Sequence, residues 1–290
     1  MLVIVGASGK LGFATLSALL DRQLISPEEI VCTTSSQRGE AKLSDARSKG
    51  VQVRKADWDD SVEHWTQTLE GCTKLFLISS ARVQKDHGYE YPDAGREADH
   101  FKVLEAAVQA KVGHVYYTSL AFANPSLSRV MTAHERTERW LKASSLRWTI
   151  VREGLYNESW PLYLATTTWT SIPDLGLANA AVLAARSDVW AGKTFYLSQK
   201  QTKSLSEVAA IVSKHKGREV KVKIVDRPSH ERYYIEERGM PDGGIWWWAR
   251  TYDALAANEC EIHDDTLETI LKGFSVTPKS MEATMEDMLS

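Results

Sequence analysis

The start of the chain constrains its fold more than any other stretch. Leu2–Val5 is a short apolar run rich in β-branched residues, which predicts a strand covered on both faces. Gly6, Gly9 and Gly12 follow with a G-x-x-G-x-x-G spacing, and an apolar helix is expected over about residues 11–20. Gly6 can adopt a turn conformation that other residues avoid, Gly9 would let a pyrophosphate approach the backbone, and Gly12 would let the helix lie close to the strand. The pattern predicts dinucleotide binding at the helix N-terminus, the alternative being an ordinary strand-to-helix turn.

Composition is that of a globular protein with a substantial core. The chain has 290 residues, of which 43% are hydrophobic and 25% charged, enough for one large or two small domains. The net charge of −3 argues against a nucleic-acid-binding surface, which needs a basic face. The cysteines Cys32, Cys72 and Cys260 lie far apart and are typical of reduced thiols in a cytoplasmic protein. We expect neither export nor membrane insertion, because the chain lacks a basic leader and a bilayer-length apolar run.

Strands alternate with helical patterns through most of the chain, which predicts an α/β fold with a Rossmann-type doubly wound parallel sheet. The expected strands are residues 2–5, 29–33, 51–57, 74–80, 114–119, 146–151 and 193–198, and the expected helices are residues 11–20, 41–49, 61–69, 97–110, 132–143 and 174–186. After Ser204 the pattern changes to a helix over 205–215, a strand over 220–225 and charged helices. We therefore expect an NADP-binding Rossmann domain of residues 1–155 plus about 174–200, and a smaller C-terminal α+β substrate lobe of residues 156–173 and 201–290.

The end of the second strand indicates which dinucleotide binds. NAD-specific sites have an acid here that holds the adenosine ribose, but this chain has Thr34-Ser-Ser-Gln-Arg38 instead. Small hydroxyls, Arg38 and Lys10 of the glycine loop suit a 2′-phosphate, so the sequence favours NADPH over NADH. The alternative is that Arg38 and Lys42 belong to the solvated start of a helix.

Further candidate cofactor contacts lie at the carboxyl ends of parallel strands, where such sheets bind ligands. Asp57 and Trp58 follow the third strand and would lie beside the adenine, although Asp57 could instead cap the next helix. The same rule marks the ends of the fourth and fifth strands, which are Ser79, Ser80, Thr118, Ser119 and Leu120.

An ordered set of motifs resembles the NmrA-like family, a group of atypical short-chain dehydrogenases with this glycine spacing. The set comprises residues 51–83, Tyr117-Thr-Ser-Leu120, the helix His134–Leu141, the segment Arg152-Glu-Gly-Leu-Tyr-Asn-Glu158 and Met240-Pro-Asp-Gly243. The resemblance covers nearly the whole chain and is strongest to the NADPH-dependent quinone oxidoreductase type of that family.

The resemblance implies a Rossmann fold, NADPH bound along the first strands and a substrate cleft between the sheet and the C-terminal lobe. It implies that His134 lies near the nicotinamide ribose, and that Tyr156 and Asn157 lie where the chain crosses the nicotinamide end. The complete set of candidate cofactor contacts is then Gly6, Ser8, Gly9, Lys10, Leu11, Gly12, Ser35, Arg38, Asp57, Trp58, Ser79, Ser80, Thr118, Ser119 and His134.

The sequence departs from the family pattern at two points. The Tyr-x-x-x-Lys pair of typical dehydrogenases is missing from its usual place. Tyr196 and Lys200 have that spacing only on a late expected strand, where positions four apart lie roughly 13 Å from each other. The stretch between Ala165 and Asp174 is also shorter than the resemblance implies.

The candidate catalytic residues are His134, Tyr156 and Asn157. His134 could donate a hydrogen bond or relay a proton, because an imidazole titrates near pH ~6.5, or it could only bind a ribose hydroxyl. Tyr156 and Asn157 could orient an acceptor, the alternative for Tyr156 being core packing. Trp246–Trp248 could stack on a flat aromatic substrate or alternate between core and surface. The scattered histidines predict no metal site.

Three hypotheses follow for the function. The first is an NADPH-dependent oxidoreductase that reduces a quinone or another conjugated carbonyl by hydride transfer. The second is a non-catalytic NADP(H) sensor that controls a protein partner, which the missing Tyr/Lys pair favours. The third is a biosynthetic reductase or isomerase of an aromatic natural product. A small aromatic or quinone-like substrate is expected, and the sequence also allows a homodimer or a regulatory protein partner.

Overall fold

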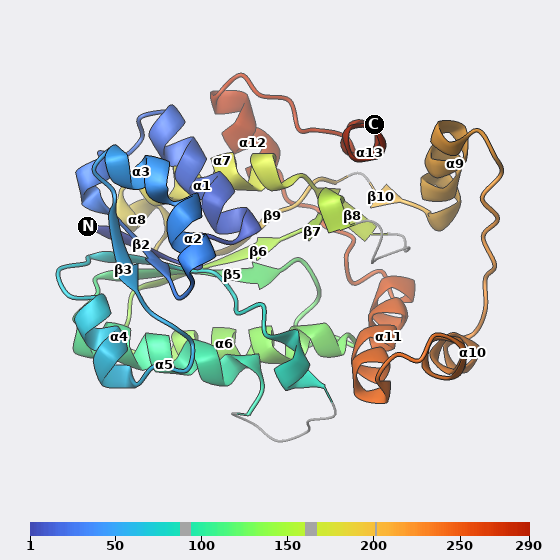
Figure 1. Ribbon diagram of the computed structural model, residues 1–290, viewed down its shortest axis with the longest axis horizontal. Coiled ribbons are helices and arrows are strands. Elements are labelled where there is room, and N and C mark those ends of the chain that lie inside the picture. Colours follow the sequence, from blue (N-terminus) through green and yellow to red (C-terminus); the bar gives the residue numbers. More distant parts are fainter. Residues whose placement is uncertain (88–93, 160–166, 201) are drawn as a thin grey trace.

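A seven-stranded parallel sheet forms the centre of the computed structural model, which describes residues 1–87, 94–159, 167–200 and 202–290 (Figure 1). Its strand order is β3-β2-β1-β4-β5-β6-β9, and every neighbouring pair is parallel. The strands are β1 (Leu2–Val5), β2 (Ile30–Thr34), β3 (Gln52–Lys55), β4 (Lys74–Leu77), β5 (His114–Leu120), β6 (Trp148–Glu153) and β9 (Thr194–Leu197). This order reverses direction between β1 and β4, which is the Rossmann arrangement expected from the sequence.

Helices cover both faces of the sheet (Figure 1). One face carries α1 (Lys10–Asp21), α2 (Gln37–Lys42), α3 (Ser44–Ser48), α7 (Ile172–Ala184), α8 (Ser187–Trp190) and α12 (Thr266–Gly273), and the other carries α4 (Val62–Thr68), α5 (Arg96–Gln109) and α6 (Thr132–Ala143). Leu16, Leu175 and Leu271 are fully buried in the core on the first face. Leu104 and Leu141 are fully buried in the core on the second. Burial on both faces explains why the central strands are nearly continuous apolar runs.

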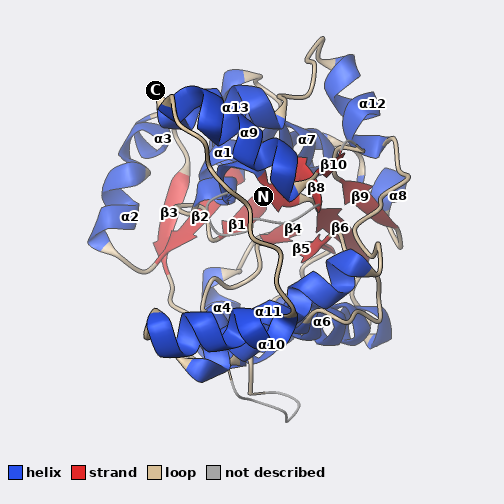
Figure 2. Ribbon diagram, turned by 90° about the vertical axis from the view of Figure 1, so that its right-hand side faces the viewer, coloured by secondary structure: helices blue, strands red, loops and turns tan. Residues whose placement is uncertain are grey.

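A second group of elements lies beyond the carboxyl ends of the strands. It contains the short sheet of β7 (Leu155–Tyr156), β8 (Thr167–Thr170) and β10 (Thr202–Lys203), with α9 (Leu205–Lys216), α10 (Arg227–Arg232), α11 (Asp242–Ala256) and α13 (Met281–Leu289). Figure 2, seen from this end, shows α9 and α13 on one side of the strands and α10 and α11 on the other. Short helical turns complete the described elements, at Pro27–Glu29, Val83–Asp86, Arg129–Met131, Asn157–Ser159 and Tyr233–Glu237.

The expected strand over residues 220–225 is wrong. The alternating Lys and Val pattern there is typical of a strand, but these residues have no regular secondary structure and Ile224 is 87% exposed. An alternating segment needs a neighbouring strand to pair with, and none of the described strands lies beside it. The strands of the C-terminal region are instead β7, β8 and β10.

Other differences concern boundaries. The expected helix over 41–49 begins at Gln37 and is divided into α2 and α3. Helix α12 lies within the expected substrate lobe, yet Leu267 and Leu271 belong to the core of the main sheet. Part of the shortened stretch after Ala165 lies outside the described residues, and Thr167–Thr170 forms β8. Within the described residues, no helix has the length and apolarity that a membrane crossing needs.

A buried ion pair joins α6 to the end of β6. Glu138 accepts hydrogen bonds from the Arg152 guanidinium at 2.7 and 3.0 Å, from Ser119 Oγ at 2.7 Å and from Asn124 Nδ2 at 3.0 Å. Burial alone would raise the pKa of the Glu138 carboxyl, but Arg152 lowers it overall, so the carboxylate is charged. The pair therefore holds the carboxyl ends of β5 and β6 in register with α6.

Arg152→Met should strongly destabilise the fold, because it leaves the Glu138 charge buried without its partner. We expect the free energy of unfolding, measured by urea denaturation, to fall on the order of 3–5 kcal/mol. The matched control is Arg186→Met, which removes an exposed pair with Asp188 and should cost about 1 kcal/mol or less. Equal effects of the two variants would contradict the structural importance of the buried pair.

Candidate active site

The glycine loop forms a tight cradle between β1 and α1. Gly6 has a φ of +86°, a backbone conformation that favours glycine, and its carbonyl accepts a hydrogen bond from the Gly9 N–H at 3.0 Å. A Cβ at Gly12 would lie 2.3 Å from the Gly6 carbonyl oxygen, so any side chain there would push the helix away. No side chain caps the N-terminus of α1. The cradle and the free N–H groups of the first turn therefore fit a pyrophosphate.

A cavity of about 510 Å³ extends from this loop across the carboxyl edge of the sheet. Its walls come from the glycine loop, from the ends of β4, β5 and β6, and from α5, α6 and α11. The sequence-predicted residues that line it are Gly6, Gly9, Lys10, Leu11, Gly12, Trp58, Ser79, Ser80, Thr118, Ser119, Leu120, His134 and Tyr156. One cavity thus brings together residues that the sequence places in separate motifs.

The remaining predicted cofactor contacts, Ser8, Ser35, Arg38 and Asp57, do not line the cavity. Ser8 lies beside α2, because its carbonyl accepts a hydrogen bond from Lys42 at 3.0 Å. Gly39 permits this approach, since a Cβ there would lie 3.0 Å from Ser8 Oγ and 1.9 Å from Thr34 Oγ1. Arg38 is exposed on the same short helix and makes no ion pair with any described residue. Lys42 is therefore part of the loop's support, and Arg38 stays a candidate for the 2′-phosphate.

Asp57 caps the turn that follows β3. Its carboxylate accepts the Asp59 N–H at 3.0 Å, and this hydrogen bond is the main reason that its pKa is lowered. The helix α4 that follows has Ser61 as its N-cap, so the alternative role of Asp57 as that cap is wrong. Trp58, one residue on, lines the cavity.

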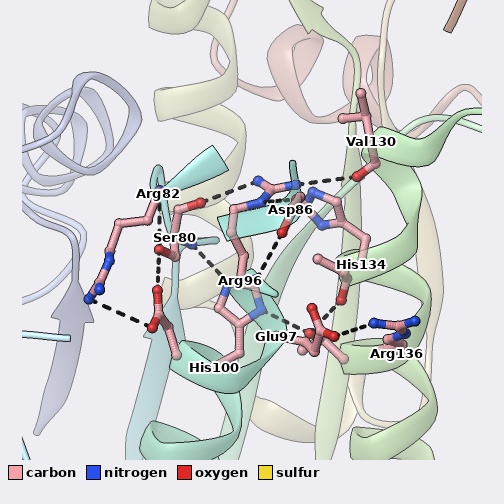
Figure 3. A network of polar contacts seen from close by, with 12 residues as sticks. Ser80, Arg82, Asp86, Arg96, Glu97, His100, Val130, His134 and Arg136 are labelled. Carbon is pink, nitrogen blue, oxygen red and sulfur yellow. Dashed lines mark hydrogen bonds and ion pairs between the residues drawn. The ribbon is translucent and has the colours of Figure 1, made fainter. Parts of the chain in front are cut away.

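A buried arginine that sequence reasoning missed stands in the cavity wall. Arg96 donates from Nε to Asp86 at 2.7 Å, and its terminal nitrogens donate to the carbonyls of Ser80 at 3.3 Å and Val130 at 3.2 Å. Figure 3 shows the guanidinium spanning between these two carbonyls, with His134 beside it. Arg96 is 5% exposed, so this network fixes a positive charge at the cavity.

His134 is a neutral imidazole in this setting. The side chain is 3% exposed, and burial followed by the charge of Arg96 lowers its pKa well below the usual value. The expectation that its pKa lies near working pH is therefore wrong, because the sequence does not show how deeply the ring is buried. Its Nδ1 lies 2.9 Å from the Tyr117 hydroxyl, and its Nε2 has no hydrogen-bond partner among the described residues.

The hydrogen bonds behind His134 have a defined direction. His100 Nε2 accepts the Ser80 N–H at 2.9 Å, so the neutral ring carries its proton on Nδ1 and donates it to Thr137 Oγ1 at 2.8 Å. Thr137 in turn donates to the Ala133 carbonyl. The Tyr117 hydroxyl, whose pKa is raised by burial, can then donate to Nδ1 of His134. In this arrangement His134 Nε2 carries a proton that it can donate to a ligand.

A second residue that the sequence did not single out is Glu153, the last residue of β6. Glu153 is among the residues that line the cavity and is 2% exposed. Asn179 Nδ2 donates to Oε1 at 2.7 Å, and the Tyr156 hydroxyl lies 3.3 Å from Oε2. Burial raises the pKa of Glu153 to about 8, although both hydrogen bonds oppose the shift. The signals in the sequence were its place just after an expected strand and within the family segment Arg152–Glu158.

Asn157 does not reach the cavity, which corrects its expected role as a contact of the acceptor. Its side chain is fully buried, and Nδ2 donates to Thr284 Oγ1 at 3.0 Å and to the Lys279 carbonyl at 3.3 Å. Asn157 therefore anchors α13 to the end of the short strand β7. The side chain of its neighbour Tyr156 lies on the opposite face of the chain, and Tyr156 lines the cavity.

The tryptophan run on α11 alternates between core and surface. Trp247 is 8% exposed and lines the cavity, with its ring 5.9 Å from the Arg96 guanidinium. Trp246 is 47% exposed, so only part of the run could contact a ligand. Across the described ranges, no group of three or more His, Cys, Asp or Glu side chains could hold a metal ion.

Comparison with known proteins gives consistent matches. The NAD(P)H-binding family model matches residues 6–168. Quinone oxidoreductase 2 of Escherichia coli is 28% identical over 256 residues, covering 84% of each chain. An NmrA-like family domain-containing oxidoreductase, flvB of Aspergillus flavus, is 29% identical over 77% of this chain and 74% of its own. The crystal structure of the E. coli NADPH-dependent quinone oxidoreductase QOR2, complexed with NADPH, superposes with a TM-score of 0.83 at 25% identity and covers 100% of both chains.

Glu153→Gln should reduce the dependence of stability on pH. The native protein holds the Glu153 proton up to about pH 8, whereas the unfolded chain releases it near the usual 4.5. Between these values the unfolded state binds fewer protons, so the free energy of unfolding decreases as pH rises. At about 1.36 kcal/mol per pKa unit, the raised pKa of Glu153 makes the free energy of unfolding of wild type on the order of 3 kcal/mol lower at pH ~7 than at acidic pH.

Urea denaturation at several pH values measures the effect. Wild type should lose stability relative to Glu153→Gln between about pH 5 and pH 8. The exposed Glu105→Gln is the matched control and should keep the wild-type pH dependence. Parallel curves for wild type and Glu153→Gln would show that the Glu153 carboxyl is ionised in the native state.

Proposed function

The chain belongs to the NAD(P)H-binding family, and from this premise we propose that it is an NmrA-like oxidoreductase that reduces a quinone or another conjugated carbonyl with NADPH. The observation that carries the proposal is the continuity of the cavity. A single space joins the glycine loop to a wall made by His134, Tyr156 and Trp247. A dinucleotide bound at the loop would therefore have its reactive end beside a partly aromatic pocket.

The glycine loop and the first turn of α1 would hold the pyrophosphate. Arg38 and Lys10 are the proposed contacts of the 2′-phosphate, and the absence of an acid at the end of β2 supports NADPH over NADH. Thr118 and Ser119, at the end of β5, would face the ribose and nicotinamide. When bound, NADPH supplies the hydride, so the protein's task is to position the acceptor and stabilise the charge that develops on its oxygen.

His134 is the proposed donor to that oxygen or to a ribose hydroxyl. The neutral ring can donate from Nε2 while Nδ1 is held by Tyr117. Arg96 lines the same cavity as a buried guanidinium that is ion-paired with Asp86. The His134 donor favours a negative oxygen in the cavity. A Tyr/Lys pair is not needed for this stabilisation, and Tyr196 bonds to Arg152 instead.

The acceptor is proposed to be flat and conjugated. Trp247 provides aromatic surface in the cavity wall near His134 and Arg96, and such surface suits a planar ring system. The similarity to E. coli quinone oxidoreductase 2 supports a quinone as the first acceptor to try. The segments after β6 and around α11 would act as the substrate-covering part of the chain.

His134→Phe should lower turnover by about 10²-fold, since it removes one donor while preserving ring volume. The measurement is NADPH oxidation, followed by nicotinamide absorbance, with a panel of quinones and enones. The dissociation constant of NADPH should change only a few-fold if His134 acts on the acceptor. The exposed His263→Phe is the control and should behave as wild type. Unchanged turnover would remove His134 from the mechanism, and a large loss of NADPH affinity would assign it to the ribose.

Arg38→Ala should weaken NADPH binding by roughly 10- to 10²-fold and leave NADH binding nearly unchanged. The reason is that a guanidinium–phosphate contact is a charge-assisted hydrogen bond, and only NADPH carries the 2′-phosphate. Fluorescence titrations of both dinucleotides test this, with Arg47→Ala on the neighbouring helix α3 as a matched exposed control. Equal losses for NADPH and NADH would contradict the 2′-phosphate contact.

Turnover by wild type with at least one acceptor is required by the proposal. Tight NADPH binding without turnover of any acceptor would overturn it in favour of a non-catalytic sensor.

A further inference from the structure

Glu153 is a buried carboxyl in the cavity wall that no positive charge of the described residues compensates. Its only described polar partners are Asn179 on α7 and Tyr156 on β7. The adjacent Arg152 turns away, with its guanidinium on Glu138 and Tyr196. No lysine, arginine or histidine within the described ranges pairs with Glu153. An ionised carboxylate in such a place is costly, so the neutral acid is the favoured form.

Glu138 and Glu153 are two buried carboxyls with opposite protonation. Glu138 is paired with Arg152 and its pKa is lowered, whereas burial raises the pKa of Glu153 to about 8. Neighbouring acids whose environments push their pKa values apart commonly divide into a fixed charge and a proton donor. Glu138 holds the fold together, and Glu153 alone of the two faces the cavity.

The hydrogen bonds around Glu153 indicate where its proton lies. Oε1 accepts from Asn179 at 2.7 Å, which leaves Oε2 as the protonated oxygen. In the structure the Tyr156 hydroxyl donates to Oε2 at 3.3 Å, and the same contact carries a hydrogen bond in the opposite direction when Oε2 is protonated and Tyr156 accepts. Both Glu153 and Tyr156 line the same cavity as His134. A path for a proton therefore leads from the interior of the sheet to the acceptor end of the site.

We propose that Glu153 is the acid that protonates the reduced acceptor in this cavity, with its proton passing by way of the Tyr156 hydroxyl. The inference rests on the proposed oxidoreductase function and deepens it. His134 then stabilises the negative oxygen by a hydrogen bond. Because the pKa of His134 is low, its ring is not a cation that could give up a proton, and Glu153 supplies that proton instead.

The step balances without a further reactant. The O–H bond at Oε2 of Glu153 breaks, and its electron pair stays on the carboxylate. Tyr156 accepts that proton as it gives its own to the acceptor oxygen, where a new O–H bond forms. The acceptor oxygen is negative because the acceptor has gained an electron pair with the hydride from NADPH. A proton from water restores the Glu153 acid after the product has left.

A purely structural role for Glu153 makes a different prediction. Glutamine has the same shape, accepts from Asn179 equally well and can donate to Tyr156, so it would serve packing as well as the neutral acid does. It cannot release a proton. Glu153→Gln therefore separates proton donation from structure.

The test compares the pH profiles of kcat for wild type and Glu153→Gln with a quinone that wild type turns over. Wild-type kcat should fall as pH rises through about 8, because the acid form is lost. The kcat of the variant should not fall in this pH range. Near neutral pH it should be lower than the kcat of wild type by about 10²-fold. NADPH affinity should remain close to that of wild type. If Glu153→Gln has the same kcat and the same pH profile as wild type, the proposal is overturned.

Asn179→Leu provides a second variant with a directional readout. The hydrogen bond from Asn179 lowers the pKa of Glu153. Loss of this hydrogen bond should therefore move the fall of kcat to higher pH. Thr149→Val is the control, since Thr149 is buried at the opposite end of β6 and bonds to His114 and the Trp190 carbonyl. If kcat falls at the same pH in wild type and in Asn179→Leu, the assignment of this fall to Glu153 is contradicted.

Infrared spectroscopy gives a readout that does not depend on turnover. Wild type at neutral pH should show the carbonyl band of a protonated carboxyl, which is absent in Glu153→Gln and disappears as pH rises through about 8. Absence of the band at neutral pH would overturn the role of Glu153 while leaving the proposed function intact. Failure of wild type to reduce any acceptor would overturn the proposed function, and proton donation by Glu153 with it.

Discussion

The close approach of helix α1 to the end of strand β1 is the constraint on which the rest of this molecule depends. Only a residue without a side chain fits at position 12, because the Gly6 carbonyl occupies the place where a Cβ would lie. That approach directs the first turn of α1 at the carboxyl edge of the sheet. Gly176 allows α7 to pack against Ala14 of the same helix, so α1 is held on both sides. The cavity begins where these packing contacts end.

Buried charges then shape the cavity. Arg96 is fixed by Asp86 and by two backbone carbonyls, and Arg152 is fixed by Glu138. These paired groups are costly to bury but specify where the strand ends and helices meet. His134 and Glu153 lie among them without counter-ions, and both are therefore neutral near pH 7. The site consists of neutral hydrogen-bonding groups supported by charged ones.

Some walls of the cavity come from continuous stretches of sequence, and others are assembled from elements that lie far apart in the chain. The glycine loop, the ends of β4 and β5 and the first turn of α1 are features that a continuous stretch of sequence contains, and each of them lines the cavity. The acceptor wall is assembled from α5, α6, α11 and the end of β6. Arg96 and Glu153 meet there only through the tertiary fold.

The sequence by itself determined the Rossmann order of strands and helices and identified many of the residues that line the cavity. It could do so because hydrophobic periodicity and glycine spacing are local properties, and because the carboxyl ends of parallel strands share one edge. Only the tertiary structure decided the protonation of His134 and Glu153, since a pKa depends on burial and on charges distant in the chain. It also decided that Asn157 faces α13 and that residues 220–225 form no strand, because both depend on which elements pack beside them.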